Sequence, residues 1–418
     1  MQTNPNLSKA NFKIFAIRDF RFYIVSRLLF VIAVQMQAVV VGWQVYSITK
    51  DPLALGMIGL AEALPSIAVA LYAGHLADRI PRKLIAVVAM SVLILCSVLL
   101  WMFTWDGEIF LKSNGAYPIY LTIILSGLAR GFIAPSIFAF MTQIVPREFY
   151  PNSAAISGTS FQIGAVVGPA LGGIVYGFYG VSFAYALDLF FISLAFILFL
   201  FIPSRPLPPF DSKERLRSSL ISGLKFVFKN EYVLGAMSLD MFAVLFGGAV
   251  ALLPIFAADI LHVGSEGLGM LRAAPAMGAV GMAFFLSFKP PLRNSGRILL
   301  WSVGGFGFSM IVFGLSTSFI ISLIALFMSG VFDSISVVIR STIMQVMTPD
   351  TLRGRVSSVN KIFIGSSNEI GAFESGVTAK LMGTVPSVLF GGIMTLLIVA
   401  ASLKTFPKLS KLELKDHL

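Results

Sequence analysis

Long apolar stretches separated by short polar connectors run through the whole chain. A bilayer core of roughly 30 Å needs about twenty apolar residues per helix, because hydrocarbon offers the backbone no partner outside its own helix. Twelve stretches meet this need, and we predict that each is a membrane-spanning helix. The predicted spans are Phe20–Tyr46, Leu53–Leu76, Leu84–Phe103, Ile119–Met141, Ser153–Tyr176, Phe183–Phe201, Tyr232–Phe256, Leu268–Phe288, Ile298–Leu315, Phe319–Met344, Val356–Leu381 and Val385–Leu403.

The composition agrees with a protein surrounded by lipid. Hydrophobic residues make up 57% of the chain and charged residues 12%, whereas a soluble domain has about 25% charged residues. The net charge of +11 is spread over short connectors and forms no basic domain, so we expect no nucleic-acid partner. The predicted fold class is an all-α membrane protein of twelve helices.

Lysine and arginine residues gather in alternate connectors between the predicted spans. One side carries most of them, including the run from Arg79 to Lys83, whereas the other side has little beyond Lys50, Lys112 and Lys380. Connectors rich in lysine and arginine stay in the cytoplasm. We therefore expect both termini to be cytoplasmic.

The spans divide into two similar groups of six. Residues 1–203 are the predicted N-terminal half, and residues 231–418 are the C-terminal half with a short tail. Residues 204–230 are the linker, with a basic amphipathic stretch that predicts a helix at the membrane interface. Gly127 and Pro146 precede Gly330 and Pro349 at a constant offset, which indicates a weak internal repeat.

The connector after the second span contains the most specific motif. Its sequence Gly-His-Leu-Ala-Asp-Arg-Ile-Pro-Arg-Lys resembles the G-x-x-x-D-R-x-G-R-R/K signature of the major facilitator superfamily. The matching residues are Gly74, Asp78, Arg79, Arg82 and Lys83. Pro81 replaces the usual glycine, which puts the turn geometry in doubt. The resemblance implies a cytoplasmic gate in which Asp78 faces the positive N-terminus of the eleventh span.

A second motif lies in the fifth span. The run from Gly164 to Gly173 resembles the G-P-x-x-G-G motif of the antiporter branch of this superfamily. Its residues are Gly164, Gly168, Pro169, Gly172 and Gly173. Glycines four positions apart allow helices to approach closely, and proline bends a helix. We expect a role in helix packing, and ordinary packing of small residues is the alternative to a family motif.

Further segments resemble one bacterial subgroup of the superfamily. They include Ala38–Tyr46, Leu252–Phe256, Gly267–Pro275 and Arg353–Val356, and the similarity covers nearly the whole chain. This subgroup contains the enterobactin exporter and macrolide efflux proteins. The resemblance implies a multi-pass transporter of the bacterial inner membrane, with no enzymatic activity.

Ionisable side chains inside the predicted spans are candidates for function, because each costs at least about 2.5 kcal/mol at bilayer depth. We expect substrate contact or proton coupling from Arg27, Glu62, Arg130, Asp240, Asp333, Glu369 and Glu374. Structural ion pairs are the alternative. Arg340 and Lys361 are expected to extend to the cytoplasmic interface, and Asp188 and Arg272 to lie close to the outer interface.

Other chemistry is sparse. The three histidines lie far apart, and there is no phosphate-binding loop, so we expect no metal, no cofactor and no ATP hydrolysis. The one cysteine, Cys96, lies within a span. Polar and aromatic residues that could contact an amphipathic substrate are Trp43, Gln44, Tyr46, Phe161, Gln162, Ser366, Ser367 and Asn368. Helix packing or interfacial anchoring is the alternative for each of them.

Taken together, the residues and the resemblance predict a secondary transporter that works by alternating access. We expect protons to drive efflux of a small amphipathic compound, such as a drug or a siderophore, through a monomer. Uptake of a nutrient or metal chelate by symport, lipid flipping, and a receptor that no longer transports are the alternatives.

Overall fold

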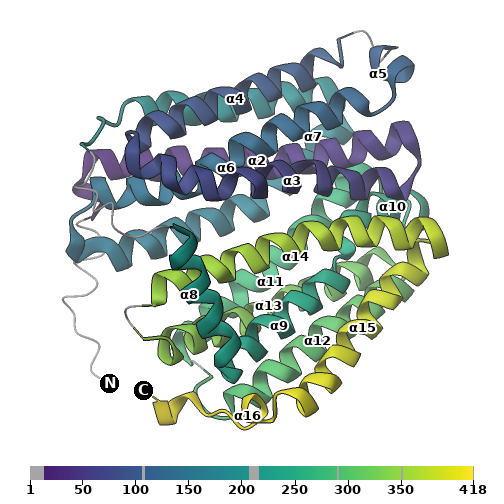
Figure 1. Cartoon of the computed structure of the whole chain (residues 1–418). Coiled ribbons are helices and arrows are strands. Elements are labelled where there is room, and N and C mark those ends of the chain that lie inside the picture. The colour runs from purple at the N-terminus through teal and green to yellow at the C-terminus, as the bar shows by residue number, and fades with distance from the viewer. Residues whose placement is uncertain (1–13, 106–108, 207–215, 290, 350–351, 418) are drawn as a thin grey trace. The chain divides into compact units, whose positions relative to one another are not determined.

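The computed structural model describes residues 14–105, 109–206, 216–289, 291–349 and 352–417, and every regular element in this part of the chain is a helix (Figure 1). The long helices are α2 (Arg18–Thr49), α3 (Pro52–Arg79), α4 (Arg82–Met102), α6 (Tyr117–Ile144), α7 (Tyr150–Leu200), α9 (Glu231–Phe246), α11 (Gly264–Phe288), α12 (Ser295–Leu315), α13 (Phe319–Met347), α14 (Arg353–Met382) and α15 (Thr384–Thr405). The short helices are α5 (Ile109–Asn114), α8 (Leu216–Lys229), α10 (Leu253–Ile255) and α16 (Pro407–Ser410). The all-α fold class is as the sequence predicts.

Among the described residues, ten helical stretches are long and apolar enough to cross a membrane. Two features explain the difference from the twelve predicted spans. Helix α7 contains the fifth and sixth predicted spans, which are joined across a kink at Gly180, where φ is 82°. Helix α14 has the length of a span but is less apolar than the others, because it carries several charged residues. All the predicted spans are therefore largely helical.

The seventh predicted span departs most from a regular helix. Helix α9 starts at Glu231, where the Asn230 side chain accepts hydrogen bonds from the backbone N–H groups of Tyr232 and Val233. It ends at Phe246, ahead of two consecutive glycines, and a 3₁₀ turn, α10 and a π-helical turn follow up to Ile260. The apolar run predicts the span, but glycine and proline residues break its helix.

Residue contacts divide the chain into two compact units. The first comprises residues 1–44 and 64–210, and the second comprises residues 45–63 and 211–418. The end of α2 and the first half of α3 thus belong to the second unit. The half boundaries near residues 203 and 230 stay a prediction.

The core of the first unit lies among α2, α4, α6 and α7. The glycine motif of α7 packs directly on α2. A Cβ atom at Gly168 would lie 2.7 Å from the backbone oxygen of Ile32, and one at Gly172 would lie 2.9 Å from that of Met36. The glycines therefore let two backbones approach more closely than any side chain would allow.

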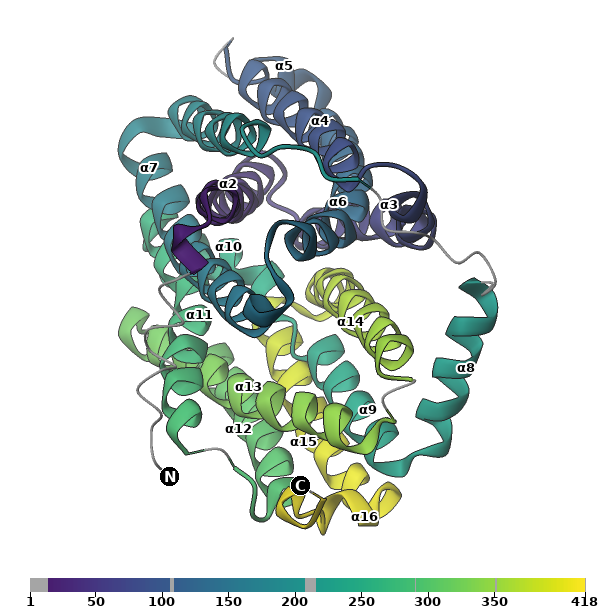
Figure 2. The same cartoon turned by 90° about the vertical axis from the view of Figure 1, so that its left-hand side faces the viewer.

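In the second unit, helices α9, α11, α12, α13 and α15 run alongside one another as a bundle (Figures 1 and 2). Helix α8 packs against α9 and α14, and the Arg355 guanidinium donates a 3.1 Å hydrogen bond to the Ser222 hydroxyl. Residues 45–63 pack closely on α14, since a Cβ atom at Gly376 would lie 2.8 Å from the Cα atom of Gly56. The Lys380 ammonium donates a 2.7 Å hydrogen bond to Asp51 and holds the pKa of that carboxyl below its usual value.

Candidate functional site

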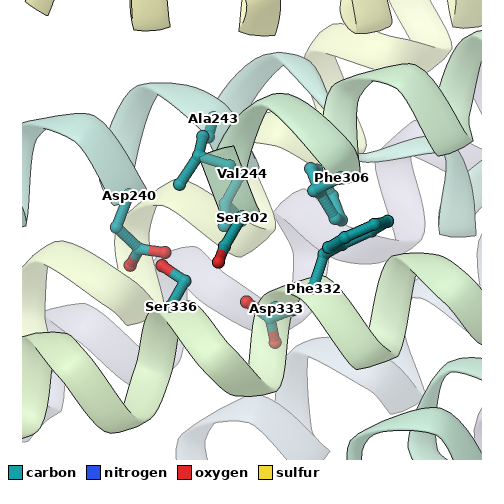
Figure 3. A pocket seen from close by; sticks show the side chains of 9 residues that line it. Asp240, Ala243, Val244, Ser302, Phe306, Phe332, Asp333 and Ser336 are labelled. Carbon is teal, nitrogen blue, oxygen red and sulfur yellow. The ribbon is translucent and has the colours of Figure 1, made fainter. Parts of the chain in front are cut away.

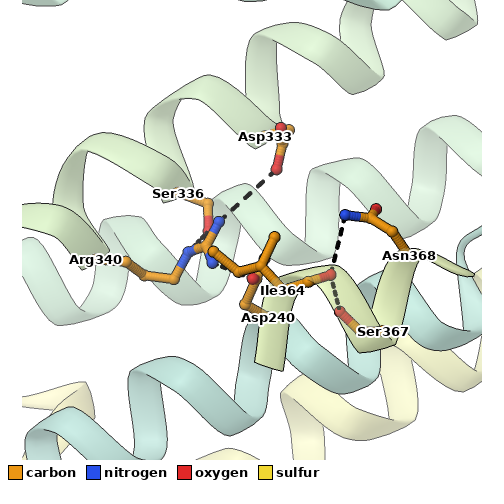
Figure 4. Close-up of polar contacts among 7 residues, drawn as sticks. All are labelled: Asp240, Asp333, Ser336, Arg340, Ile364, Ser367 and Asn368. Atoms are coloured by element: carbon orange, nitrogen blue, oxygen red, sulfur yellow. Dashed lines mark hydrogen bonds and ion pairs between the residues drawn. The ribbon is translucent and has the colours of Figure 1, made fainter. Parts of the chain in front are cut away.

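A buried ion pair joins α9 to α13 in the second unit. The guanidinium of Arg340 contacts the carboxylate of Asp240, and each residue is only 6% exposed (Figure 4). Arg340 also donates a 3.1 Å hydrogen bond from Nε to the hydroxyl of Ser336, one turn earlier on α13. These contacts fix the guanidinium between the two helices.

A second carboxylate faces the same guanidinium. Asp333 Oδ1 lies 4.0 Å from Arg340 Nη2, and the Asp333 side chain is 46% exposed. Asp333 precedes Arg340 by seven positions, which places both on the same face of α13. The result is a cluster in which Asp240 is buried and closely paired, whereas Asp333 is accessible and loosely paired.

The two carboxylates also line a small pocket of about 10 Å³ (Figure 3). Asp240, Ser302, Asp333 and Ser336 supply its polar groups, and Phe306 and Phe332 stand beside one another at its edge. Pockets for drug-sized ligands are typically about 300–1,000 Å³. A pocket of this size suits water and protons better than a whole substrate.

Among the side chains that the structure describes, the charges of this cluster do not balance. Two carboxylates and one guanidinium leave one negative charge when all three groups are ionised. An uncompensated charge inside a membrane protein is costly, and one added proton would remove it. The cluster can therefore bind a single proton.

The prediction that the Arg340 side chain extends to the cytoplasmic interface was wrong. Its position toward one end of a span predicted a side chain that extends to the interface, but the structure buries it against Asp240. Its seven-residue spacing from Asp333 was the signal that could have placed it in the site. The Lys361 side chain lies outside the described part of the chain.

A second group of charges involves α11 and α14. Arg272 interacts electrostatically with Glu62 and Glu369, so it lies near two acidic residues. A Cβ atom at Gly59 would lie 3.4 Å from the Glu369 carboxylate, which agrees with close packing of residues 45–63 on α14. Glu374 is partly buried on α14, and the structure does not bring it into the Asp240 cluster.

The two predicted arginines of the first unit lie on different helices. Arg27 on α2 donates a 3.3 Å hydrogen bond to the backbone oxygen of Ser157 on α7. Arg130 lies on α6 and acts electrostatically on Asp188. Asp188 is 1% exposed, so it lies deep in the packing of this unit and not at a polar interface.

The motif from Gly74 to Lys83 covers the end of α3 and the start of α4. The Lys83 ammonium donates a 2.9 Å hydrogen bond to the Leu200 carbonyl at the end of α7, and Arg82 donates one of 3.0 Å to the Ala139 carbonyl on α6. Cations at helix C-termini are stabilising. The structure does not describe the side chains of Asp78 and Arg79 or the surroundings of Gly74. The cytoplasmic gate therefore stays a prediction.

Several residues that we expected to contact a substrate instead contact other residues of the protein. Gln44 accepts a 2.6 Å hydrogen bond from Tyr185, Trp43 packs edge-on against Tyr176, and Tyr46 donates to Asp259. The side chains of Ser367 and Asn368 both donate to the Ile364 carbonyl of their own helix, beside the Asp240 cluster (Figure 4). Phe161 is exposed, and the Ser366 side chain lies outside the described part.

Comparison with solved structures shows the same fold in known transporters. The chain superposes on a crystal structure of the POT family transporter PepTSo with a TM-score of 0.73 at 12% identity, covering 94% of this chain and 99% of that one. It superposes on a mutant of the nucleoside transporter NupG with a TM-score of 0.72 at 12% identity, covering 93% and 99%. At these identities the similarity concerns the fold alone.

Sequence comparison finds relatives of higher identity. The enterobactin exporter EntS of Escherichia coli O81 is 26% identical over 385 residues, which cover 91% of this chain and 89% of the exporter. EntS of Citrobacter koseri is 25% identical over 379 residues, covering 89% and 88%. The family model described as transmembrane secretion effector matches residues 9–417. The chain therefore belongs to this transmembrane secretion effector family, and it is a membrane transporter of the major facilitator superfamily.

Proposed function

We propose that this transporter exports a small amphipathic compound, with siderophores as the first candidates, in exchange for protons. The observation that carries the proposal is the Asp240–Arg340–Asp333 cluster, whose unbalanced charge one proton can neutralise. The similarity to enterobactin exporters over nine-tenths of the chain supports a siderophore as the substrate. We place the protein in the bacterial inner membrane as a monomer.

Alternating access explains how such a cluster would couple proton entry to export of the substrate. A carboxylate near a cation prefers to be ionised, and it binds a proton when the cation moves away or when water is excluded. Asp333 is the accessible carboxylate and lies loosely beside Arg340, so a movement of α9 against α13 that shifts the guanidinium together with Asp240 would change the proton affinity of Asp333. Asp240 would remain the permanent partner of Arg340.

The first test uses the purified protein in liposomes, with enterobactin as the probe. An exporter that exchanges substrate for protons should accumulate enterobactin in liposomes with an acidic interior, whichever way the protein is inserted. Each proton exchanged is expected to support about a tenfold concentration ratio per pH unit. Accumulation that requires an alkaline interior would indicate a symporter, and accumulation without any gradient dependence would contradict proton coupling.

We also propose that both termini are cytoplasmic, and cysteine labelling tests it. In a Cys96→Ala background, a cysteine at Ser113 should react with an impermeant thiol reagent added to intact cells, whereas one at Ser204 should not. Both positions are exposed, and Cys96 is buried, so the labelling reports the side of the membrane. The reverse pattern would overturn the orientation.

A further inference from the structure

A buried carboxylate in the first unit forms a polar site that the Asp240 cluster does not include. Asp188 lies on the second half of α7, eight positions after the Gly180 kink, or roughly 12 Å along the helix. It is 1% exposed and faces Gln37 on α2 and Ser97 on α4.

Only one of the two carboxylate oxygens of Asp188 accepts hydrogen bonds from described residues. Its Oδ2 atom accepts a 3.0 Å hydrogen bond from Gln37 Nε2 and a 2.8 Å hydrogen bond from the Ser97 hydroxyl. Gln37 also donates to Ser97, at 3.2 Å, so the three side chains form a closed network. Within the described part of the chain, Oδ1 is buried and has no hydrogen-bond partner.

An ionised carboxylate is poorly suited to this environment. It can accept about four hydrogen bonds, and here the described residues supply two, both from uncharged donors and both to one oxygen. Among the described residues, the titratable or charged side chains that act on Asp188 from the packed helices are Arg130 of α6 and Cys96 of α4. A proton on Oδ1 would remove the buried charge without disturbing the network on Oδ2.

We propose that Asp188 is a second proton-binding site, formed with Gln37 and Ser97 in the first unit. In the arrangement seen here the carboxyl group carries a proton on Oδ1. When the helices move so that Arg130 approaches, the guanidinium stabilises the carboxylate and the proton leaves to water. The use of this proton in transport rests on the proposed exporter function, whereas its binding does not.

Infrared spectroscopy of the purified protein tests the binding step without any substrate. The wild-type spectrum should contain a carbonyl band of a protonated carboxyl group that is missing in Asp188→Asn. The Asp51→Asn variant is the control, because Asp51 lies outside the spans, pairs with Lys380 and should be ionised. Identical spectra of the wild type and Asp188→Asn would overturn the proposal.

A second variant keeps the test valid if Asp188→Asn does not fold. Ser97→Ala removes one donor that favours the ionised form, so the band should persist to higher pH than in the wild type. An unchanged pH dependence in Ser97→Ala would contradict the network described above.

Transport then decides whether this proton moves. If Asp188 carries one proton in each cycle, Asp188→Asn should lower the substrate ratio that a one-unit pH gradient sustains about tenfold relative to the wild type. A band that disappears in Asp188→Asn while the ratio is unchanged would make Asp188 a static neutral acid and refute its transport role. A wild type without gradient-driven transport would instead refute the proposed export function, and the infrared result would still stand.

Discussion

Replacing Asp333 by asparagine should sharply reduce transport driven by a pH gradient while exchange of substrate at equal pH continues. Asp333 is the accessible carboxylate of the cluster, and its neutral replacement leaves Asp240 and Arg340 as a balanced pair. Without the proton that this cluster gains and loses, the gradient can act only through Asp188, so a one-unit pH gradient should sustain about a tenfold smaller substrate ratio. Exchange needs no net proton movement, so it should persist. Both activities are measured in liposomes with labelled substrate.

Asp240→Asn should behave differently, because it removes the close partner of a buried guanidinium. Breaking a buried ion pair costs roughly 3–5 kcal/mol, although the remaining Asp333 would offset part of this here. We expect lower stability and loss of both transport activities. Ser336→Ala is the control, since it removes the 3.1 Å hydrogen bond to Arg340 without changing the charge.

The opposite pattern would assign the proton to Asp240. If Asp240→Asn loses only gradient-driven transport while Asp333→Asn keeps it, the buried carboxylate is the carrier. If both variants keep full gradient-driven transport, the coupling proposal for this cluster is wrong. Glu62, Glu369 and Glu374 would then be the carboxylates to test.

Replacing Gly278 by alanine should strongly destabilise the second unit. Gly278 lies on α11 where it packs on α13, and a Cβ atom there would overlap the backbone oxygen of Phe327. A backbone atom cannot move aside as the end of a side chain can, so we expect a cost of about 3 kcal/mol or more. The measurement is the melting temperature and the yield of monodisperse protein in detergent.

Gly281→Ala is the matched control for this prediction. Gly281 lies three positions further along the same helix, and a Cβ atom there would meet no atom within 4 Å. Alanine favours the helix over glycine by roughly 0.5–1 kcal/mol, so this variant should be as stable as the wild type or slightly more stable. Equal melting temperatures for the two variants would show that α11 and α13 do not pack as described.

The amino-acid sequence alone determined which segments form long apolar helices that are able to cross a membrane. Apolar runs of this length have no other stable form in hydrocarbon than a helix, because each backbone group must find its partner within the segment. The same reasoning identified Asp240 and Asp333 as costly, and therefore candidate functional, groups. The apolar run from Tyr232 to Phe256 shows what hydropathy cannot predict. It identifies the segment as a span but does not show that the helix ends at Phe246, before two glycines.

Only the tertiary structure decided which of these groups meet. Hydropathy gives the depth of a residue but not the rotation of its helix, and the rotation places Arg340 against Asp240 and away from the interface. The burial of Asp188 follows in the same way, because it depends on α2 and α4, which come much earlier in the chain. Contacts between helices far apart in sequence arise from how their side chains pack, and a single sequence contains no direct record of that packing.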